Sequence, residues 1–191
     1  MGTTTAQVIR GYIQRRDHTL MRRVNRWRPP RWFRWWMICA TRLGDGWLWY
    51  ALGAILLGFG GSDGPVAVIA AALAAAASIV LFRMLKKASG RKRPCALEPH
   101  RWASIAPPDQ FSFPSGHTLT AFAVAIAVGM FYPDLMGLLL FLAVSIGMSR
   151  IALGMHFLSD VIAGSLLGMG LGYAAFCFFS SLYPLLSPQI F

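Results

Sequence analysis

Residues 65–82 read PVAVIAAALAAAASIVLF, an uncharged run that is followed by the basic residues Arg83, Lys86 and Lys87. Its length is close to the roughly 20 apolar residues that an α-helix needs to cross a bilayer. The long basic side chains that follow can reach back to the headgroup region. We therefore predict a membrane-spanning helix over residues 65–82.

Four further uncharged runs lie on either side of this one. They cover residues 46–61, 114–133, 135–149 and the stretch from about His156 to Phe191, in which no charged residue follows Asp160. A single run of this kind is equally compatible with a buried helix of a soluble protein. Five of them in a chain of 191 residues with 56% apolar and only 13% charged residues leave too little polar surface for a soluble domain. The predicted fold class is an all-α integral membrane protein, a bundle of five transmembrane helices.

The last run carries a regular spacing of small residues. Gly164, Gly168 and Gly172 recur every four residues and share one face of a helix. Such a face lets a neighbouring helix approach closely. The spacing does not decide whether that neighbour belongs to the same chain or to a second copy.

The first 45 residues differ in character from the rest. Ten of the 18 basic residues lie between Arg10 and Arg42, interleaved with several tryptophans, and Pro29–Pro30 predicts a break between two short helices. Guanidinium and indole groups together suit the headgroup region of a membrane. We therefore divide the chain into a basic, aromatic-rich interfacial segment over residues 1–45 and a transmembrane domain over residues 46–191.

Other interpretations of the N-terminal segment are weaker. A sixth crossing would need residues 32–43, which are too few and include Arg34 and Arg42. No apolar core of a signal peptide follows the basic stretch, so none is expected. The net charge of +11 also suits nucleic acid, but the segment leads directly into a predicted span, which makes a nucleic-acid partner the poorer interpretation.

The three cysteines carry no site signature. Cys39, Cys95 and Cys177 are far apart, odd in number and lack CxxC spacing, so we expect free thiols and neither a disulfide nor a zinc site.

Three polar clusters lie where the predicted spans begin or end. They are KxxxxxxRP at 86–94, PSGH at 114–117 and SRxxxxxHxxxD at 149–160. The KxxxxxxRP motif follows the second predicted span, PSGH precedes the third span, and SRxxxxxHxxxD joins the fourth span to the fifth. Counting the crossings therefore puts all three motifs on one side of the membrane. One pocket can therefore hold them.

The residue types in these clusters suit phosphate. Lys86, Arg93 and Arg150 supply cationic donors for phosphate oxygens. Pro114 is expected in the first turn of a helix, where Ser115, Gly116 and His117 would offer free backbone N–H groups, and a glycine leaves room for the ligand.

The two histidines of the clusters suit nucleophilic and acid–base chemistry. His156 and Asp160 are four residues apart, so on one helix face the carboxylate would accept a hydrogen bond from the imidazole and orient its other nitrogen for attack on phosphorus. His117 is then available to protonate the leaving oxygen. The remaining histidines, His18 and His100, are expected to be structural, and Arg83, Lys87, Arg91 and Lys92 to be membrane anchors.

Together the three motifs resemble those of the phosphatidic acid phosphatase type 2 superfamily, which includes membrane lipid phosphatases, bacterial acid phosphatases and vanadium haloperoxidases. The resemblance implies that His156 is the nucleophile, Asp160 its partner and His117 the general acid. It implies phosphate binding by Lys86, Arg93, Ser115, Gly116 and Arg150, and it implies no metal and no cofactor.

The apolar spans favour the membrane branch of that family and hence a lipid substrate. Candidate substrates are polyprenyl pyrophosphates, phosphatidylglycerophosphate, phosphatidic acid and the phosphates of lipid A. The alternative is a membrane protein that binds lipid phosphates without turnover. The small size of the chain and the absence of an appended domain suggest a bacterial enzyme of the inner membrane. Because basic residues favour the cytoplasm, we expect the catalytic side to face inward.

Overall fold

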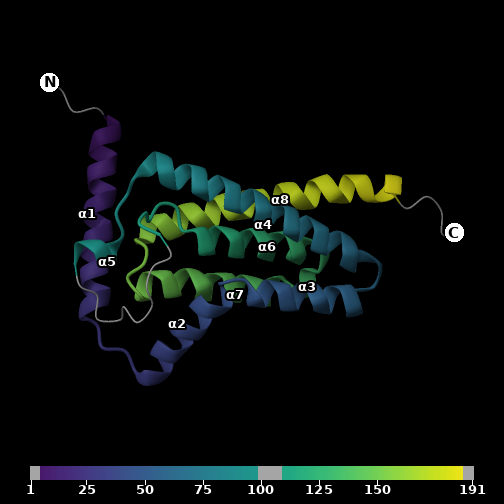
Figure 1. The fold of residues 1–191 in the computed structure, drawn as a ribbon, viewed down its shortest axis with the longest axis horizontal. Helices are drawn as coiled ribbons and strands as arrows, with labels where there is room; N and C mark the ends of the chain where they lie inside the picture. The colour runs from purple at the N-terminus through teal and green to yellow at the C-terminus, as the bar shows by residue number, and fades with distance from the viewer. Residues whose placement is uncertain (1–4, 99–108, 187–191) are drawn as a thin grey trace.

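A computed structural model describes residues 5–98 and 109–186. Its elements are α1 (Thr5–Arg26), α2 (Arg31–Leu43), α3 (Trp47–Phe59), the short 3-10 helix η1 (Gly61–Asp63), α4 (Gly64–Ser89), α5 (Pro94–Leu97), α6 (Gly116–Phe131), α7 (Pro133–Ala152) and α8 (Leu158–Leu186). The five helices α3, α4, α6, α7 and α8 lie along the long axis of the molecule, and α1 crosses one end of the bundle (Figure 1).

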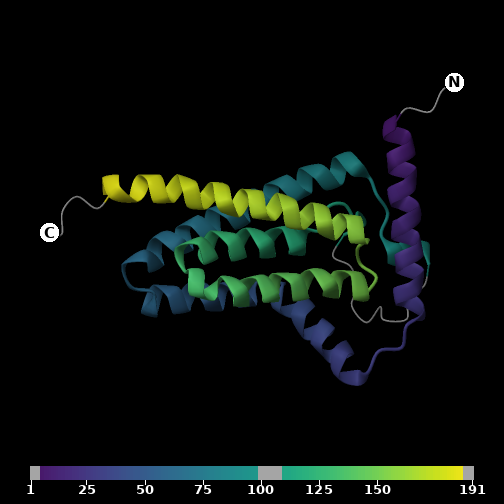
Figure 2. The ribbon, with the colours of Figure 1, turned by 180° about the vertical axis from the view of Figure 1, so that it is seen from behind.

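Helix α6 forms the centre of the bundle. It lies among α4, α7 and α8 (Figure 2) and packs against all three. Most of its side chains from Gly116 to Gly129 are buried. The core around it consists mainly of alanine, valine and leucine. Large apolar side chains on the outer helices, such as Leu138, Phe141 and Leu166, are exposed and face the surroundings, as they do in a protein whose solvent is lipid.

The all-α membrane fold predicted from the sequence is confirmed. Helical stretches over Gly61–Ser89, Pro133–Ala152 and Leu158–Leu182 are long and apolar enough to cross a membrane, and α3 and α6 are shorter apolar helices. The second span extends past Phe82 to Ser89 and ends at Gly90, whose φ of 57° is left-handed. The final run is helical to Leu186, and its last five residues lie outside the described part.

The glycines of α8 allow its close packing on α6. A Cβ atom built on Gly164, Gly168 or Gly172 would lie 2.8, 2.3 and 2.3 Å from the carbonyl oxygens of residues 115, 119 and 123. These are backbone atoms and cannot move aside. The small-residue face therefore packs within one chain, which answers a question that the spacing left open.

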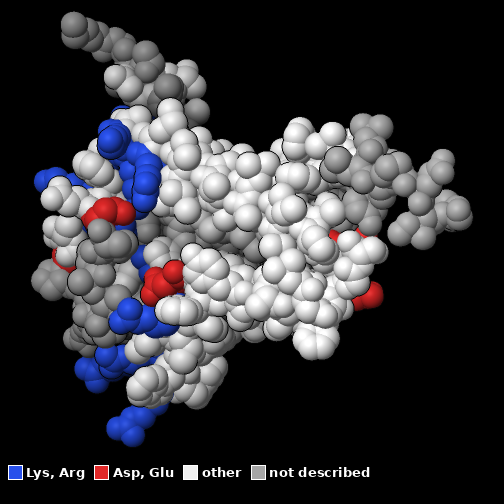
Figure 3. All heavy atoms as spheres, turned by 45° about the vertical axis from the view of Figure 1, so that its right-hand side comes forward, with Lys and Arg blue, Asp and Glu red and all other residues white. Residues whose placement is uncertain are grey.

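The N-terminal segment forms two helices separated at Pro29–Pro30, as predicted. Helix α2 lies at an angle against α7, where Trp36 stacks on Phe141 with ring centroids 5.9 Å apart (Figure 1). Its 13 residues include Arg31, Arg34 and Arg42, so it is both short and too charged for a crossing helix. Figure 3 shows the Lys and Arg side chains gathered at the end of the molecule that α1 covers.

Candidate active site

The three motifs meet at the end of the bundle that α1 crosses. They occupy the C-terminal ends of α4 and α7 and the N-terminal ends of α6 and α8, and the backbone N–H of Ser115 donates to the carbonyl of Asp160. The side chains of Lys86, Arg93, Ser115, Arg150, His156 and Asp160 are all buried. The predicted convergence of the three motifs, which lie between Lys86 and Asp160, is therefore found.

The hydrogen bonds of His156 fix its tautomer. Its Nδ1 lies 2.6 Å from the carbonyl oxygen of Ser112, which can only accept, so Nδ1 carries the proton. Its Nε2 lies 3.0 Å from Nη1 of Arg93, which can only donate, so Nε2 is unprotonated and its lone pair accepts this hydrogen bond. This lone pair is what a nucleophilic imidazole needs.

The surroundings of His156 keep the ring neutral. The residue is 2% exposed and lies in the loop between α7 and α8. Burial lowers the pKa of His156 well below its ordinary value, and the charges of Arg93, Arg150 and Lys86 lower it further against the opposing hydrogen bond to Ser112. The imidazole therefore carries one proton and no charge at neutral pH.

Asp160 is placed differently from the prediction. Helix α8 begins at Leu158, so His156 precedes it and the two residues do not share a helix face. Asp160 Oδ2 accepts the backbone N–H of Phe157 at 2.8 Å and lies 3.7 Å from Nδ1 of His156. The carboxylate thus caps α8 and acts on the ring through its charge. The hydrogen bond from Nδ1 of His156 goes to the Ser112 carbonyl instead.

Arg150 is a buried cation with unused donors. Its Nη1 donates to Oγ1 of Thr41 on α2 at 2.6 Å. Its Nε and Nη2 are buried and have no hydrogen-bond partner among the described residues. Buried donors without partners are costly, so these two atoms mark a place where an anionic ligand would be stabilised.

A carboxylate pairs with the other two cations that the sequence predicts to bind phosphate. Asp109 pairs with Lys86 through Oδ2 at 2.5 Å and with Nη2 of Arg93 through Oδ1 at 2.7 Å. Burial alone would raise the pKa of Asp109, but the hydrogen bonds from Lys86 and Arg93 outweigh it and hold the pKa below its ordinary value. An anion therefore already occupies the position where these cations would receive phosphate oxygens.

His117 lies at the N-terminus of α6 and is paired with a carboxylate. Its Nε2 is 2.8 Å from Oδ1 of Asp45, in the turn between α2 and α3. Gly44 permits this, because a Cβ there would lie 2.9 Å from Ile146 and 3.4 Å from the His117 ring. Asp45 orients His117 as the carboxylate of a catalytic triad orients its histidine.

The PSGH segment begins α6 in a slightly different register from the prediction. The helix starts at Gly116 with Ser115 as its N-cap, so Pro114 precedes it rather than occupying the first turn. A Cβ on Gly116 would lie 3.1 Å from the ring of Phe82, so this glycine also permits helix packing. The backbone N–H groups of Gly116 and His117 remain in the first turn, where they lack intrahelical acceptors.

Several polar residues that the sequence did not single out complete the site. They are Asp17, Thr41, Asp45, Arg91, Asp109 and Ser112. Arg91 was expected to be a membrane anchor, and this is wrong, since it pairs with Asp17 and Asp160 at 2.6 and 2.7 Å. The packing of His18 on Phe157 agrees with a structural role, whereas His100 lies outside the described residues.

The three cysteines are free thiols, as predicted. Within residues 5–98 and 109–186, no group of three His, Cys, Asp or Glu side chains is arranged to hold a metal ion.

Comparison with known protein families gives a match over more than half of the chain. A family model described as the PAP2 superfamily matches residues 67–183. Lipid A 1-phosphatase of Rhizobium johnstonii is 37% identical over 93 residues, 47% of this chain and 38% of that protein. The undecaprenyl-diphosphatase of Sulfolobus acidocaldarius is 30% identical over 140 residues, 72% of this chain and 66% of that protein. The chain thus spans well under half of the lipid A 1-phosphatase that it matches.

A solved structure is similar over nearly the whole chain. The transmembrane PAP2-type phosphatidylglycerolphosphate phosphatase of Bacillus subtilis has a TM-score of 0.71 and 26% identity, with 90% of this chain and 88% of that chain covered.

Proposed function

Because the chain belongs to the PAP2 superfamily, we propose that it is a membrane phosphatase that hydrolyses a lipid phosphomonoester or pyrophosphate. The observation that carries the proposal is the neutral imidazole of His156, whose Nε2 lone pair lies beside Arg93. Unused donors of Arg150 are buried in the same site. Cations around an unprotonated imidazole nitrogen suit attack on phosphorus better than simple binding.

The first step forms a phosphohistidine. Nε2 of His156 attacks phosphorus while the bond from phosphorus to the leaving oxygen breaks, and His117 donates a proton to that oxygen. The proton on Nδ1 stays with the ring, whose positive charge is stabilised by the Ser112 carbonyl and by Asp160. Lys86, Arg93 and Arg150 stabilise the charge on the phosphoryl oxygens, helped by the backbone N–H groups of Gly116 and His117, since the N–H of Ser115 is already bonded to the carbonyl of Asp160.

The second step returns the enzyme to its starting state. Water attacks the phosphorus of the phosphohistidine, His117 accepts a proton from that water, and the bond between phosphorus and Nε2 breaks. Phosphate then leaves and Asp109 pairs again with Lys86 and Arg93. Asp45 orients the ring of His117 in both steps and stabilises the protonated ring that the second step restores.

The reaction is proposed to need no metal and no cofactor. The donors gathered around the phosphate position are cationic or neutral, and three fixed positive charges there would repel a metal ion. The same charges supply the electrostatic stabilisation that a metal provides in other phosphatases.

The substrate is proposed to be a lipid because the site lies at one end of an apolar bundle. Relatives of the chain are named for lipid A, undecaprenyl diphosphate and phosphatidylglycerolphosphate. All three share a phosphate at the polar end of a long apolar tail. We place the enzyme in a bacterial inner membrane, without a nucleic-acid partner.

Phosphate release by the detergent-purified protein tests this function. The panel contains a polyprenyl pyrophosphate, phosphatidylglycerophosphate, phosphatidic acid and lipid A, each with and without a chelator. We expect release from at least one lipid, insensitivity to the chelator, inhibition by vanadate and loss of release in His156→Ala. A protein that binds these lipids without releasing phosphate would instead be the non-catalytic alternative.

A further inference from the structure

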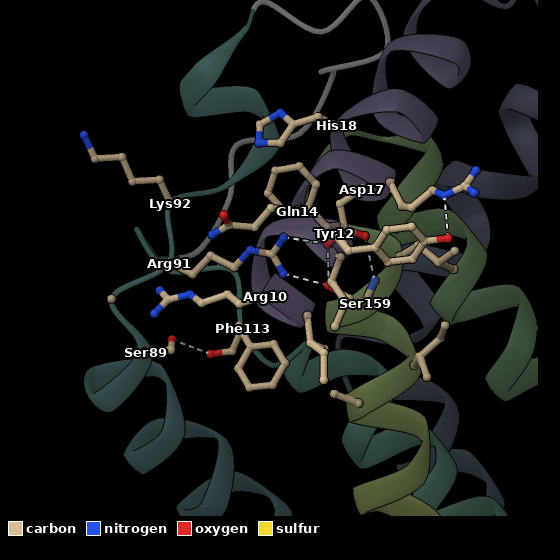
Figure 4. Close-up of a pocket in the computed structure, with 18 of the residues that line it drawn as sticks. Arg10, Tyr12, Gln14, Asp17, His18, Ser89, Arg91, Lys92, Phe113 and Ser159 are labelled. Carbon is tan, nitrogen blue, oxygen red and sulfur yellow. Dashed lines mark hydrogen bonds and ion pairs between the residues drawn. The ribbon is translucent and has the colours of Figure 1, made fainter. Parts of the chain in front are cut away.

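Helix α1 contributes a buried carboxylate to the catalytic end of the bundle. Asp17 is 4% exposed. It accepts hydrogen bonds from Nη2 of Arg91 at 2.6 Å and from the backbone N–H and the hydroxyl of Ser159 at 3.1 and 2.5 Å (Figure 4). Three donors at one carboxylate hold it in a single position.

Arg91 connects this carboxylate to the catalytic one. Its Nη1 donates to Oδ1 of Asp160 and to Oγ of Ser159, both at 2.7 Å, while Nη2 donates to Asp17. The guanidinium also lies over the ring of Phe157, 4.3 Å from its centroid. A planar fork held at both nitrogens and on one face cannot rotate away from Asp160.

The chain of charges continues to His156. Asp160 presents Oδ1 to Arg91 and Oδ2 toward Nδ1 of His156, 3.7 Å away. With Arg91 paired to Asp160 alone, the guanidinium charge would cancel the carboxylate charge that stabilises a positive imidazole. A second carboxylate on Arg91 restores a net negative charge behind the ring.

We infer that Asp17 is a positioning residue for catalysis, which acts through Arg91 on Asp160 and so on His156. The inference rests on the proposed role of His156 as nucleophile. Under it, α1 is part of the catalytic architecture and not only a contact with the membrane surface. Asp17 does not reach the phosphate site itself, because Arg91 and Asp160 lie between it and His156. Its loss is therefore expected to slow the chemical step rather than to weaken substrate binding.

The test compares kinetic constants of Asp17 variants with those of matched controls. Asp17→Asn is expected to lower kcat about tenfold or more, as removal of a partner behind a catalytic group does, while KM stays unchanged. Asp17→Glu, which keeps the charge, is expected to recover part of the loss. Arg15→Gln, an exposed change on the same helix, is expected to behave as the wild type.

A double-mutant cycle separates positioning from docking of α1. In an Arg91→Gln background, Asp17→Asn is expected to cost little more, because its route to Asp160 is already gone. Ser159→Ala removes the hydroxyl's hydrogen bonds to Asp17 and from Arg91 but keeps both ion pairs of Arg91. It is therefore expected to lower kcat much less than Asp17→Asn. Thermal unfolding of each variant reports whether α1 is still docked.

The inference is overturned if Asp17→Asn keeps the wild-type kcat, raises KM alone, costs as much in the Arg91→Gln background, or is matched by Ser159→Ala. His156→Ala keeps the two claims apart. If that variant is active, the proposed function fails; if it is inactive while Asp17→Asn is fully active, only the role of Asp17 fails.

Discussion

At the scale of the residue, Arg150 combines burial with unsatisfied hydrogen-bond donors. It is 2% exposed, and its Nε and Nη2 lack partners within the part of the chain that the structure describes. Unsatisfied buried donors lower the stability of the free protein, and a bound anion would stabilise it by accepting their hydrogen bonds.

Arg150→Met is therefore expected to remove activity without loss of stability. The apolar side chain removes two unsatisfied donors, each of which costs about 1–3 kcal/mol, and so offsets the loss of the Thr41 contact. We expect kcat/KM to fall by about 10²–10³-fold or more and the Tm to stay or rise.

The control for this variant is Arg83→Met, an exposed basic residue of α4, which is expected to keep both activity and Tm. Activity assays and thermal unfolding in detergent measure both quantities. A Tm several degrees below the wild type for Arg150→Met would show that the arginine is structural.

Asp109 pairs with Lys86 and Arg93, and we expect it to compete with the substrate for these two cations. Because its pKa lies below the ordinary value, the carboxylate stays charged as the pH falls to the ordinary carboxyl range and loses its charge only below it. Asp109→Asn removes this charge at every working pH. We expect vanadate to inhibit the variant about tenfold more strongly, a change of ~1.4 kcal/mol.

Asp134→Asn serves as the control for this measurement, since Asp134 lies in the first turn of α7 at the opposite end of the bundle. If Asp109→Asn binds vanadate more weakly than the wild type, the carboxylate orients the two cations and does not compete with the ligand.

The site residues that the sequence revealed are those in fixed local spacing. Lys86, Arg93, His117 and His156 stand in motifs whose residue types match phosphate chemistry. The sequence did not reveal Asp45 and Thr41. Asp45 contacts His117, which is 72 positions away, and Thr41 contacts Arg150, which is 109 positions away. No local spacing encodes such contacts, although the scarcity of acidic residues in this chain was a usable signal for Asp17, Asp45 and Asp109.

At the scale of the element, the packing of α8 on α6 depends on glycine at particular positions. A Cβ on Gly168 would lie 2.3 Å from the carbonyl oxygen of Leu119, whereas a Cβ on Gly170 would meet nothing within 4 Å. The two glycines belong to the same helix and differ only in the face that they occupy.

Gly168→Ala is expected to lower the free energy of unfolding by about 1–3 kcal/mol, because the helices must separate. Gly170→Ala is expected to leave stability unchanged or to raise it by up to about 1 kcal/mol through helix propensity. Thermal unfolding in detergent compares the pair. Equal effects of the two substitutions would contradict close packing of α8 on α6 through this face.

Helix positions could be predicted well and helix ends less well. Hydropathy located α3, α4, α6, α7 and α8, since long uncharged runs have few other structures in lipid. It ended the second span at Phe82, because it does not register that Lys86 and Lys87 prolong a helix. The sequence analysis also placed His156 on a helix. In the structure a turn that includes Gly154, with a φ of 68°, precedes His156, and α8 begins only at Leu158.

At the scale of the whole molecule, the charges are strongly asymmetric. Lys and Arg gather at the catalytic end, and the loops over residues 60–64 and 132–134 at the other end contain neither (Figure 3). The positive-inside rule then predicts that the catalytic end faces the cytoplasm.

Thiol labelling in intact cells tests this orientation. In a variant that retains only Cys95, a membrane-impermeant maleimide is expected to react only after lysis. A cysteine-free protein with Ser62→Cys, at an exposed position of η1, is expected to react in intact cells. Labelling of Cys95 and protection of the residue at 62 in intact cells would place the catalytic end outside.

The central claim is that His156 carries the phosphoryl group during turnover. The direct measurement is a single turnover with a lipid substrate whose phosphate is labelled. The reaction is quenched in alkali, in which phosphohistidine survives, and the labelled peptide is then identified by peptide mapping. We predict label on the peptide that contains His156, formed before phosphate release and absent from His156→Ala. Phosphate release without any labelled enzyme, or label on another residue, would contradict the account.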